Sequence, residues 1–450
     1  MQVAIDSVFS QFDSPEIPGC SVSVLLNGEL IHSAGYGSAQ LEYQIPITPS
    51  TIFHVASVSK QFTCFAMLLL AERGMLTLDD DTRTHIPELN DFGHIITIRH
   101  LCHHTSGLRD QWTLLNIAGW RPDDVVTKEH ILKLLYRQEE LNFLPGEEHL
   151  YCNSGYSLLA KIVERVTGGP FRSFLQSEIF DPLGMTATHV HDDHQKIVPN
   201  RAYSYTPKEE SGFENSILSF ANHGATSLFT TVEDLARWMN NYESKRVGSA
   251  LIRQLLETGC LNSGEKIDYA FGLTVSPYRG RKQIQHSGSD AGFRSHILMI
   301  PECRFGVVVL SNVSNSNPGG LARQIAAIVL GDVLEPPEPN GGPGPAKDEL
   351  DDPDCLLSPD CLGTYESREL QTRYEIVKEE DQILARHNRH QDLVLGCPCA
   401  DKLVGSAHYF AEVQFQRSKD GTVTGFHLSS GRVRNLRFDR ITVATHSPLP

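Results

Sequence analysis

The chain has 450 residues, of which 40% are hydrophobic and 21% charged, the composition of a globular protein with room for more than one domain. Its formal net charge of −16 argues against nucleic acid and against an anionic membrane surface as partners. No apolar run approaches the roughly 20 residues that a membrane-spanning helix needs.

The N-terminus and the cysteines bear on the cellular compartment. The segment from Met1 to Ser7 carries neither the basic nor the apolar part of a secretory signal. The cysteines are scattered singly through most of the sequence, a pattern that favours a reducing compartment. We therefore expect a cytoplasmic protein, or a periplasmic or secreted one if a signal peptide has been removed. Four cysteines gather near the C-terminus: Cys355, Cys361, Cys397 and Cys399.

Residues 1–334 alternate between strand and helix patterns. A short amphipathic helix precedes a hairpin whose strands meet at Asn27-Gly28, the dipeptide favoured in type I′ turns. Strands return at 297–300 and 305–310, and a closing helix follows at 319–331. Between the two strand regions we expect helices at about 57–73, 127–138, 155–167, 170–179 and 231–241.

This order predicts the fold class. Strands at both ends with helices between them indicate an α+β domain, in which helices and an all-helical subdomain flank an antiparallel sheet made of the terminal segments. Residues 335–355 are rich in Pro, Gly and acidic residues and predict a linker. Residues 356–450 contain short alternating apolar segments separated by turn signals, which predict a small all-β domain, a sandwich or a barrel.

Ser57 and Lys60 form a Ser-x-x-Lys motif at the start of the predicted apolar helix. Residues three apart share a helix face, so the hydroxyl and the amine would lie side by side. A serine hydroxyl needs a base to become a nucleophile, and a lysine that loses solvation can have a lowered pKa and take part in the proton transfer. The motif alone is weak, because a second copy, Ser263-Gly264-Glu265-Lys266, lies in a predicted turn.

Two further motifs strengthen the first, namely Tyr151-Cys152-Asn153 and His286-Ser287-Gly288. Together with Ser57-Val58-Ser59-Lys60 they resemble, in the same order, the three motifs of the serine β-lactamase and penicillin-binding-protein superfamily. The resemblance is strongest to the branch of class C β-lactamases, D-aminopeptidases, DD-peptidases and esterases, and it covers residues 5–332. The segment Asp181-Pro182-Leu183-Gly184-Met185 also resembles this family.

The resemblance implies roles for these residues. Ser57 would form an acyl-enzyme, and Lys60 and Tyr151 would share the proton transfers. The family suggests Tyr151 as the general base, although relatives differ on this point. Asn153 would orient Lys60 or bind a substrate amide, with a helix N-cap as the alternative. The backbone N–H groups of Ser57 and Ser289 would form the oxyanion hole, Ser289 lying on an edge strand.

The third motif separates the activities within the family. Most of the β-lactamases have lysine at the position of His286, and histidine is cationic only part of the time near neutral pH. This difference favours a D-aminopeptidase- or carboxypeptidase-like enzyme over a β-lactamase. Ser287 and Gly288 would contact the substrate, with the glycine allowing its backbone to approach closely. Arg294 is a candidate for holding a substrate carboxylate, or else a surface or structural arginine.

We expect no cofactor and no metal. His189, His191 and His194 have the residue types of metal ligands without the spacing of a zinc motif. The four C-terminal cysteines allow a zinc site or disulfides, but their Cys-x-Cys spacing favours free or casually paired thiols.

The expected function is that of a serine hydrolase cleaving an amide or ester bond of a small-molecule or peptide substrate. The alternatives are a β-lactamase, a slow-acylating penicillin-binding pseudoenzyme, and a chain whose barrel binds an apolar ligand in an open interior. The segment beyond residue 360 resembles the lipocalin-like barrel that is appended to some family members and can cover or shape the active-site entrance. The oligomeric state stays open.

Overall fold

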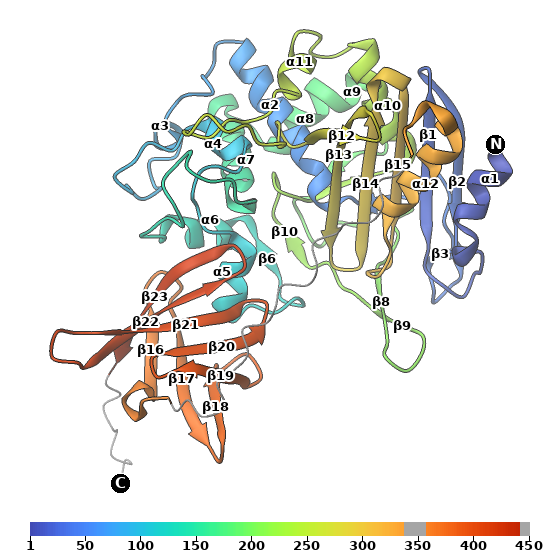
Figure 1. Cartoon of the computed structure of the whole chain (residues 1–450). Helices are drawn as coiled ribbons and strands as arrows, with labels where there is room; N and C mark the ends of the chain where they lie inside the picture. Colours follow the sequence, from blue (N-terminus) through green and yellow to red (C-terminus); the bar gives the residue numbers. More distant parts are fainter. Residues whose placement is uncertain (337–356, 442–450) are drawn as a thin grey trace.

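The computed structural model describes residues 1–336 and 357–441, which form two β-structures of different kinds (Figure 1). An open six-stranded sheet lies at the centre of the part before residue 337, and a closed barrel makes up the part after residue 356. Most of the predicted linker, at 335–355, falls outside the described residues. Among the described helices, none combines the length and the apolar character needed to cross a membrane.

The central sheet is antiparallel throughout, with the strand order β12-β13-β14-β15-β1-β2. The first strands of the chain therefore pair with its last ones, and Val24 lies opposite Val307. This arrangement confirms the predicted α+β fold. Asn27 and Gly28 both have positive φ, as a type I′ turn requires. The strands are β1 (Cys20–Leu26), β2 (Glu29–Tyr36), β12 (Thr274–Tyr278), β13 (Arg281–Asp290), β14 (Phe293–Ile300) and β15 (Phe305–Ser311).

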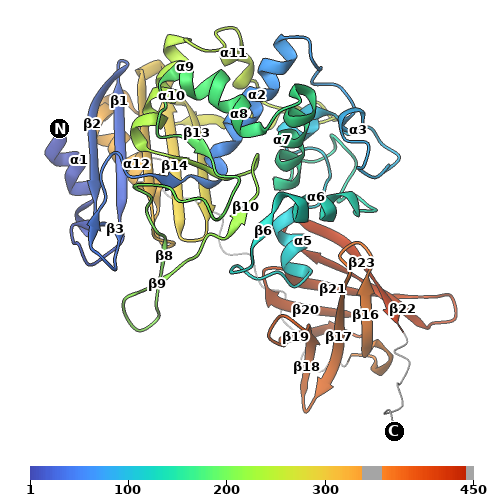
Figure 2. The ribbon, with the colours of Figure 1, turned by 180° about the vertical axis from the view of Figure 1, so that it is seen from behind.

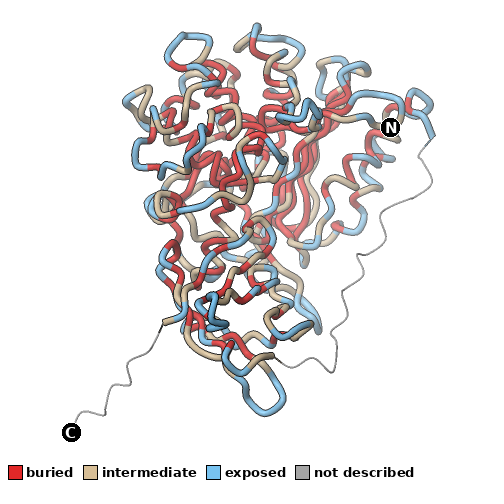
Figure 3. Tube along the Cα trace, turned by 60° about the vertical axis from the view of Figure 1, so that its left-hand side comes forward, coloured by how far each residue is buried: buried red, intermediate tan, exposed pale blue. Residues whose placement is uncertain are grey.

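Alternate side chains of the sheet enter two separate cores. Val307 and Val309 pack on the face covered by α1 (Gln2–Val8) and α12 (Pro318–Leu330). Val308 and Leu310 point to the opposite face, which α2 (Lys60–Glu72) and α10 (Val232–Ser244) cover (Figures 1 and 2). Figure 3 shows the resulting band of buried residues through the sheet and the helices behind it.

The helices between the strands follow the predicted order with two local differences. The helix predicted at 57–73 begins as a 3₁₀ turn, Ala56–Ser59, and becomes an α-helix at Lys60. The helix predicted at 170–179 is an α-helix only at Phe171–Leu175 and continues as a π turn, Gln176–Phe180, into a further short helix with Pro182 in its first turn. The remaining helices are α3 (Thr82–His85), α4 (Ile98–Cys102), α5 (Gln111–Ile117), α6 (Lys128–Tyr136), α7 (Asn153–Thr167), α8 (Phe171–Leu175), α9 (Asp181–Leu183) and α11 (Leu251–Leu255).

Short strand pairs brace the loops around these helices. They are β3 (Ser38–Gln40), β4 (Ile45–Pro46), β5 (Phe53–His54), β6 (Val126–Thr127), β7 (His189–Val190), β8 (Tyr205–Pro207), β9 (Phe213–Asn215), β10 (Phe220–Ala221) and β11 (Leu228–Thr230). The pairing of β11 with β5 fixes the chain just before Ser57, since Phe229 lies opposite His54.

The barrel closes because its first strand pairs with its last. Aromatic rings occupy its interior: Phe426 stacks on Phe438 at 4.8 Å between ring centroids, and Tyr374 lies 4.8 Å from Phe410. This packing contrasts with the open apolar interior that an apolar-ligand carrier needs. The strands are β16 (Gly363–Ser367), β17 (Thr372–Glu379), β18 (Gln382–Arg386), β19 (Leu393–Cys399), β20 (Lys402–Ala407), β21 (Phe410–Arg417), β22 (Val423–Ser430) and β23 (Val433–Ile441).

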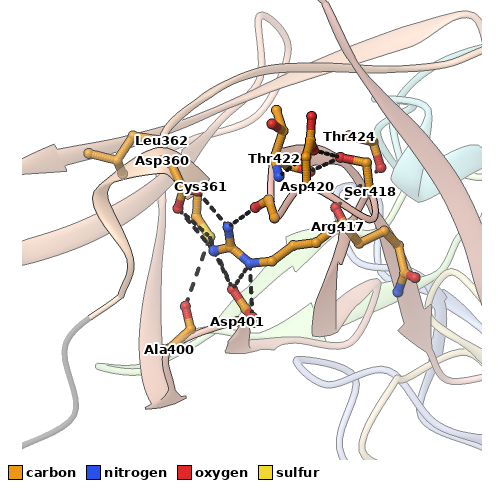
Figure 4. A network of polar contacts seen from close by, with 12 residues as sticks. Asp360, Cys361, Leu362, Ala400, Asp401, Arg417, Ser418, Asp420, Thr422 and Thr424 are labelled. Carbon is orange, nitrogen blue, oxygen red and sulfur yellow. Dashed lines mark hydrogen bonds and ion pairs between the residues drawn. The ribbon is translucent and has the colours of Figure 1, made fainter.

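A clasp of polar groups fixes the segment that enters the barrel (Figure 4). Arg417 donates to Asp360 and to Asp401, with Nη2 2.7 Å from Asp401 Oδ1. The Cys361 sulfur lies 3.7 Å from both Arg417 Nη2 and Asp401 Oδ1. Cys361 therefore belongs to this clasp, while Cys355 lies outside the described residues.

The barrel docks on the helical part of the larger domain through a buried ion pair. Arg109 is 0% and Glu369 4% exposed, and Arg109 Nη1 lies 2.9 and 2.8 Å from the two carboxylate oxygens. Glu369 also accepts from the backbone N–H of Glu139 at 3.1 Å. On the other side of the pair, Arg109 donates to the carbonyls of Arg434 and Asn435 in the barrel. These contacts fix the β22–β23 end of the barrel against the loop before α5.

Candidate active site

Ser57 lies on a tight turn that exposes it while its neighbours are buried. Ala56 has a positive φ of 47°, and its N–H donates to Nδ1 of buried His54. The hydroxyl of Ser59 closes the turn by donating to the Ala56 carbonyl at 2.6 Å. A non-glycine residue in this strained region needs such support from its surroundings. These hydrogen bonds hold Ser57 in the wall of the cavity described below.

Lys60 reaches Ser57 from a fully buried position. Its Nζ lies 3.0 Å from Ser57 Oγ, 2.8 Å from Asn153 Oδ1 and 2.7 Å from the Ala225 carbonyl oxygen. Burial lowers the pKa of the amine, and the carboxylates of Asp290 and Asp110 oppose this shift. The lowered pKa allows the amine to exist in the neutral, basic form that can accept a proton.

Asn153 orients Lys60, as one of the predicted alternatives has it. The side chain does not cap α7, whose N-cap is Cys152. Its amide is held by buried Asp110, whose Oδ2 accepts from the backbone N–H of Asn153 at 2.7 Å and from its Nδ2 at 2.8 Å. Sequence reasoning missed Asp110, which lies two residues beyond the segment His104-Thr105-Ser106-Gly107-Leu108.

Tyr151 stands on the other side of Ser57. Its ring is partly exposed, but its hydroxyl oxygen is buried and makes no hydrogen bond of standard geometry with the described residues. Burial raises the pKa of this hydroxyl, whereas Ser57 and the Arg432 guanidinium act to lower it. Lys60 Nζ lies 4.9 Å from the ring centroid. The raised pKa keeps the tyrosine protonated and suits it to donate a proton.

The third motif lies on β13, which is only partly an edge strand. β12 lies outside it but pairs only with residues 281–285, so the edge from His286 to Asp290 is open. The expectation of an edge strand at Ser289 holds for this half. A Cβ on Gly288 would lie 2.3 Å from both the Val55 carbonyl oxygen and Ser295 Oγ. The glycine is therefore required by the chain's own packing beside Ser57, independently of any substrate.

His286 is buried and neutral. Its Nδ1 faces the Ser287 carbonyl at 2.6 Å and must donate to it, so its Nε2 accepts from the Tyr269 hydroxyl at 3.0 Å. Burial, helped by the positive charge of Lys60, lowers the pKa of the imidazole to about 3. A carboxylate would find no cation at this position.

Asp290 and Arg294 lie at the far end of the open edge. The Thr226 hydroxyl donates to the Asp290 carboxylate, and its ion-pair neighbour among the described residues is His54, whose pKa burial lowers to about 3. Asp290 therefore makes no ion pair with a lysine or arginine among the described residues. Burial raises its pKa, and the positive charges of Lys60 and Arg294 oppose this rise. The Nη1 of Arg294 is taken by two backbone carbonyls, which favours its structural alternative.

Ser57, Tyr151 and Asn153 line one cavity of about 780 Å³ together with the open edge of β13. Ser287 Oγ lies 2.8 Å from His296 Nδ1 along this edge. The barrel adds a residue that sequence reasoning missed, Arg432, from the turn between β22 and β23.

The described residues contain no group of three or more His, Cys, Asp or Glu side chains placed to hold a metal ion. His189 and His191 pack instead on the ring of Phe229. Lys266, in the second Ser-x-x-Lys copy, lies in an exposed turn.

Comparison with known proteins agrees with this geometry. Residues 5–331 match the protein family described as Beta-lactamase. A D-aminopeptidase of Gluconobacter oxydans (strain 621H) is 31% identical over 337 residues, 75% of this chain and 63% of that protein. A penicillin-binding protein of Bacillus subtilis (strain 168) is 29% identical over 303 residues, 63% of this chain and 66% of that protein. The chain thus spans less than two thirds of the length of these curated relatives.

A solved structure extends the likeness to the barrel. The octameric penicillin-binding protein homologue from Pyrococcus abyssi aligns with a TM-score of 0.63 and 24% identity, over 94% of this chain and 96% of that one. At this identity the likeness shows the fold, and its coverage includes the C-terminal domain.

Proposed function

The chain belongs to the Beta-lactamase family, and from this premise we propose that it is a serine hydrolase that cleaves amide bonds through an acyl-enzyme on Ser57. One observation carries the proposal: the buried amine of Lys60, held by Asn153 and the Ala225 carbonyl, lies 3.0 Å from Ser57 Oγ. A nucleophile, a base within hydrogen-bond reach and a group that orients the base are the parts that covalent catalysis needs.

The acylation step follows from the hydrogen bonds of Lys60. In its neutral form the amine donates to Asn153 and Ala225 and accepts from the Ser57 hydroxyl. Ser57 Oγ attacks the substrate carbonyl carbon while its proton passes to Lys60. The N–H groups of Ser57 and Ser289 stabilise the oxyanion that forms. Lys60 thereby takes the part of general base that the family resemblance gave to Tyr151.

Breakdown of the intermediate uses Tyr151. Its hydroxyl donates a proton to the leaving nitrogen as the C–N bond breaks, and the resulting phenolate is reprotonated from the Lys60 ammonium. Hydrolysis of the acyl-enzyme runs these transfers in reverse. Tyr151 passes its proton to Lys60 and accepts one from the attacking water, and the Lys60 ammonium then returns a proton to Ser57 Oγ as the acid leaves. The raised pKa of Tyr151 fits a group that starts each cycle protonated.

The open edge of β13 orients the substrate. His286 lies beside Tyr151, with ring centroids 6.1 Å apart, and Asp290 lies at the opposite end of the edge beside Thr226. A substrate whose leaving nitrogen faces Tyr151 therefore directs its acyl end towards Asp290. The unpaired carboxylate there suits an ammonium next to the scissile carbonyl, as in an N-terminal amino acid. This favours an aminopeptidase, and the Gluconobacter relative named D-aminopeptidase supports the D configuration.

Slow acylation by penicillin is the second candidate, favoured by the relative named as a penicillin-binding protein. A penicillin carries a carboxylate, and the neutral state of His286 removes the cation that would hold it there. We place β-lactam turnover below aminopeptidase activity because Asp290 suits an ammonium on the acyl side of the substrate. We expect simple esters to be cleaved as a side reaction because their leaving group needs less protonation.

Intact-mass spectrometry tests the nucleophile. The wild type is incubated with a fluorophosphonate or a penicillin, beside Ser57→Ala and Ser263→Ala, the serine of the second motif copy. One adduct on the wild type and on Ser263→Ala, absent from Ser57→Ala, is the expected result. Turnover of D-alanyl p-nitroanilide in preference to the L isomer then tests the substrate class. An unmodified wild type with both reagents would contradict the proposal.

A further inference from the structure

The barrel places one arginine in the catalytic cavity. The carbonyl of Arg432 accepts from the backbone N–H of Asp110 at 3.3 Å and from Asn142 Nδ2 at 3.0 Å. Figures 1 and 2 show this end of β22 and β23 against the helical part of the larger domain. Because Asp110 also holds Asn153, the position of the barrel turn is tied to the group that orients Lys60.

The Arg432 guanidinium is fixed over Tyr151 but keeps its donors free. Its central carbon lies 4.7 Å from the Tyr151 ring centroid, a cation–π arrangement. Its Nη1 is 3.9 Å from Asp110 Oδ2, too long for a hydrogen bond, and that oxygen already accepts twice from Asn153. No residue within 1–336 or 357–441 accepts a hydrogen bond from this guanidinium, and 43% of the side chain is exposed.

The other basic side chains of the cavity differ from Arg432 in their partners or in their position. Arg294 is bound by backbone carbonyls. Arg323 lies on α12, away from Tyr151, where it donates to Gln285 at 3.4 Å. His286 is held in its neutral form by Tyr269 and the Ser287 carbonyl. Arg432 is thus the cation beside Tyr151 whose planar set of donors faces the cavity and makes no hydrogen bond with the described residues, its ion-pair partner being Asp110 at 3.9 Å.

We propose that Arg432 of the barrel turn binds a carboxylate on the leaving-group side of the substrate, so that the barrel selects amides whose departing amine is an amino acid or a short peptide acid. The inference rests on the proposed function, because Tyr151 identifies the leaving-group side by protonating the departing nitrogen. A guanidinium stacked on that ring lies next to the departing fragment, and its fork matches a carboxylate in two parallel hydrogen bonds.

This role gives a reason for the buried ion pair that docks the barrel. The buried pair of Arg109 with Glu369 lies beside Asp110 and next to the strand that follows Arg432. The cavity then has two charged ends, with Asp290 for the substrate ammonium and Arg432 for the leaving-group carboxylate. An unmodified dipeptide carries both charges at the matching positions.

Paired dipeptides test the proposal in the full-length chain. The probes are D-alanyl-glycine and its C-terminal amide, D-alanyl-glycinamide, and the measured quantity is the ratio of their kcat/KM values. We expect the wild type to prefer the acid at least about tenfold, the effect of one charge-assisted interaction. In Arg432→Gln the preference falls to about twofold or less. Because the ratio compares two substrates of one variant, a general loss of catalysis cancels.

Two variants control for folding and for charge. Arg434→Gln removes an arginine at the start of β23 that pairs with Glu148 outside the cavity, and it keeps the wild-type ratio. Arg432→Lys keeps a point charge and retains part of the preference, and it decides the matter if Arg432→Gln does not fold. A wild type without preference for the acid, or a preference unchanged in Arg432→Gln, overturns the inference. Failure to hydrolyse either dipeptide through Ser57 overturns the proposed aminopeptidase function instead.

Discussion

The two β-structures of this chain treat their strand edges in opposite ways. In the open sheet, His286 to Asp290 of β13 pair with β14 on one side and have no partner strand on the other side. The barrel pairs β16 with β23 and has no free edge. Unpaired N–H and C=O groups on an open edge can bind an extended substrate, and closure removes them.

The difference separates catalysis from selection. In the proposed mechanism the open sheet supplies the backbone that faces the substrate, while Lys60 at the start of α2 and Tyr151 just before α7 transfer the protons. The barrel, closed and filled with rings, contributes a turn whose position depends on a buried ion pair. Separate substitutions can therefore test the site beside the open edge, the docking of the barrel, and the charge of Asp290.

Loss of the base has the largest expected effect on the open-sheet side. Lys60→Met removes the amine that lies 3.0 Å from Ser57 Oγ, and we expect kcat/KM for D-alanyl p-nitroanilide to fall about 10²- to 10⁴-fold. Lys266→Met, in the exposed second motif copy, is the matched control and keeps wild-type activity. Equal losses in the two variants would contradict the assignment of Lys60.

Breaking the dock of the barrel has the next largest effect. Glu369→Ala removes the buried carboxylate from the Arg109 guanidinium and leaves it only the exposed Glu140 carboxylate at 3.4 Å as an ion-pair partner, which costs about 3 kcal/mol. The control is Glu148→Ala, which breaks the exposed pair with Arg434 across the same boundary and costs about 0–1 kcal/mol. Urea midpoints of the full chain measure both. Similar midpoints for the two variants would show that the buried pair does not hold the barrel.

Crowding the open edge has a smaller expected effect on catalysis. In Gly288→Ala the new methyl would lie 2.3 Å from the Val55 carbonyl oxygen, so β13 must move away from the turn that carries Ser57. A shift of this kind costs about 100-fold in kcat/KM. Gly306→Ala in β15 places its methyl at an ordinary 3.5 Å from Met239 and serves as control. A fully active Gly288→Ala would show that the close approach is dispensable.

The smallest expected effect is the influence of the Asp290 carboxylate on the pKa of Lys60. Acylation needs neutral Lys60, so kcat/KM rises with pH through its pKa, which burial places below the ordinary value for lysine. The Asp290 carboxylate raises that pKa, so Asp290→Asn moves the acid limb to lower pH. The pH profile of p-nitrophenyl acetate hydrolysis, a substrate without an ammonium, measures this limb. A limb that moves to higher pH contradicts Lys60 as the base.

The sequence predicted the parts of the site that rest on local pattern. Ser57 and Lys60 are three residues apart and Tyr151 and Asn153 two apart, and the structure brings the two motifs together through the bonds of Lys60 Nζ with Ser57 Oγ and Asn153 Oδ1. The α+β order and the all-β C-terminal domain also follow from short-range periodicity. The edge at Ser289 was predicted only in part, because the pairing of β12 with one half of β13 depends on strand length.

The sequence by itself predicted Ser57, Lys60, Tyr151 and Asn153 as residues of the site, and an α+β part followed by an all-β part. Only the tertiary structure decided that Asp110 orients Asn153, that His286 is neutral, and that Arg432 enters the cavity. Contacts between distant segments depend on how domains pack, and a pKa depends on how much solvent that packing removes. Neither quantity is encoded in the spacing of residues along the chain.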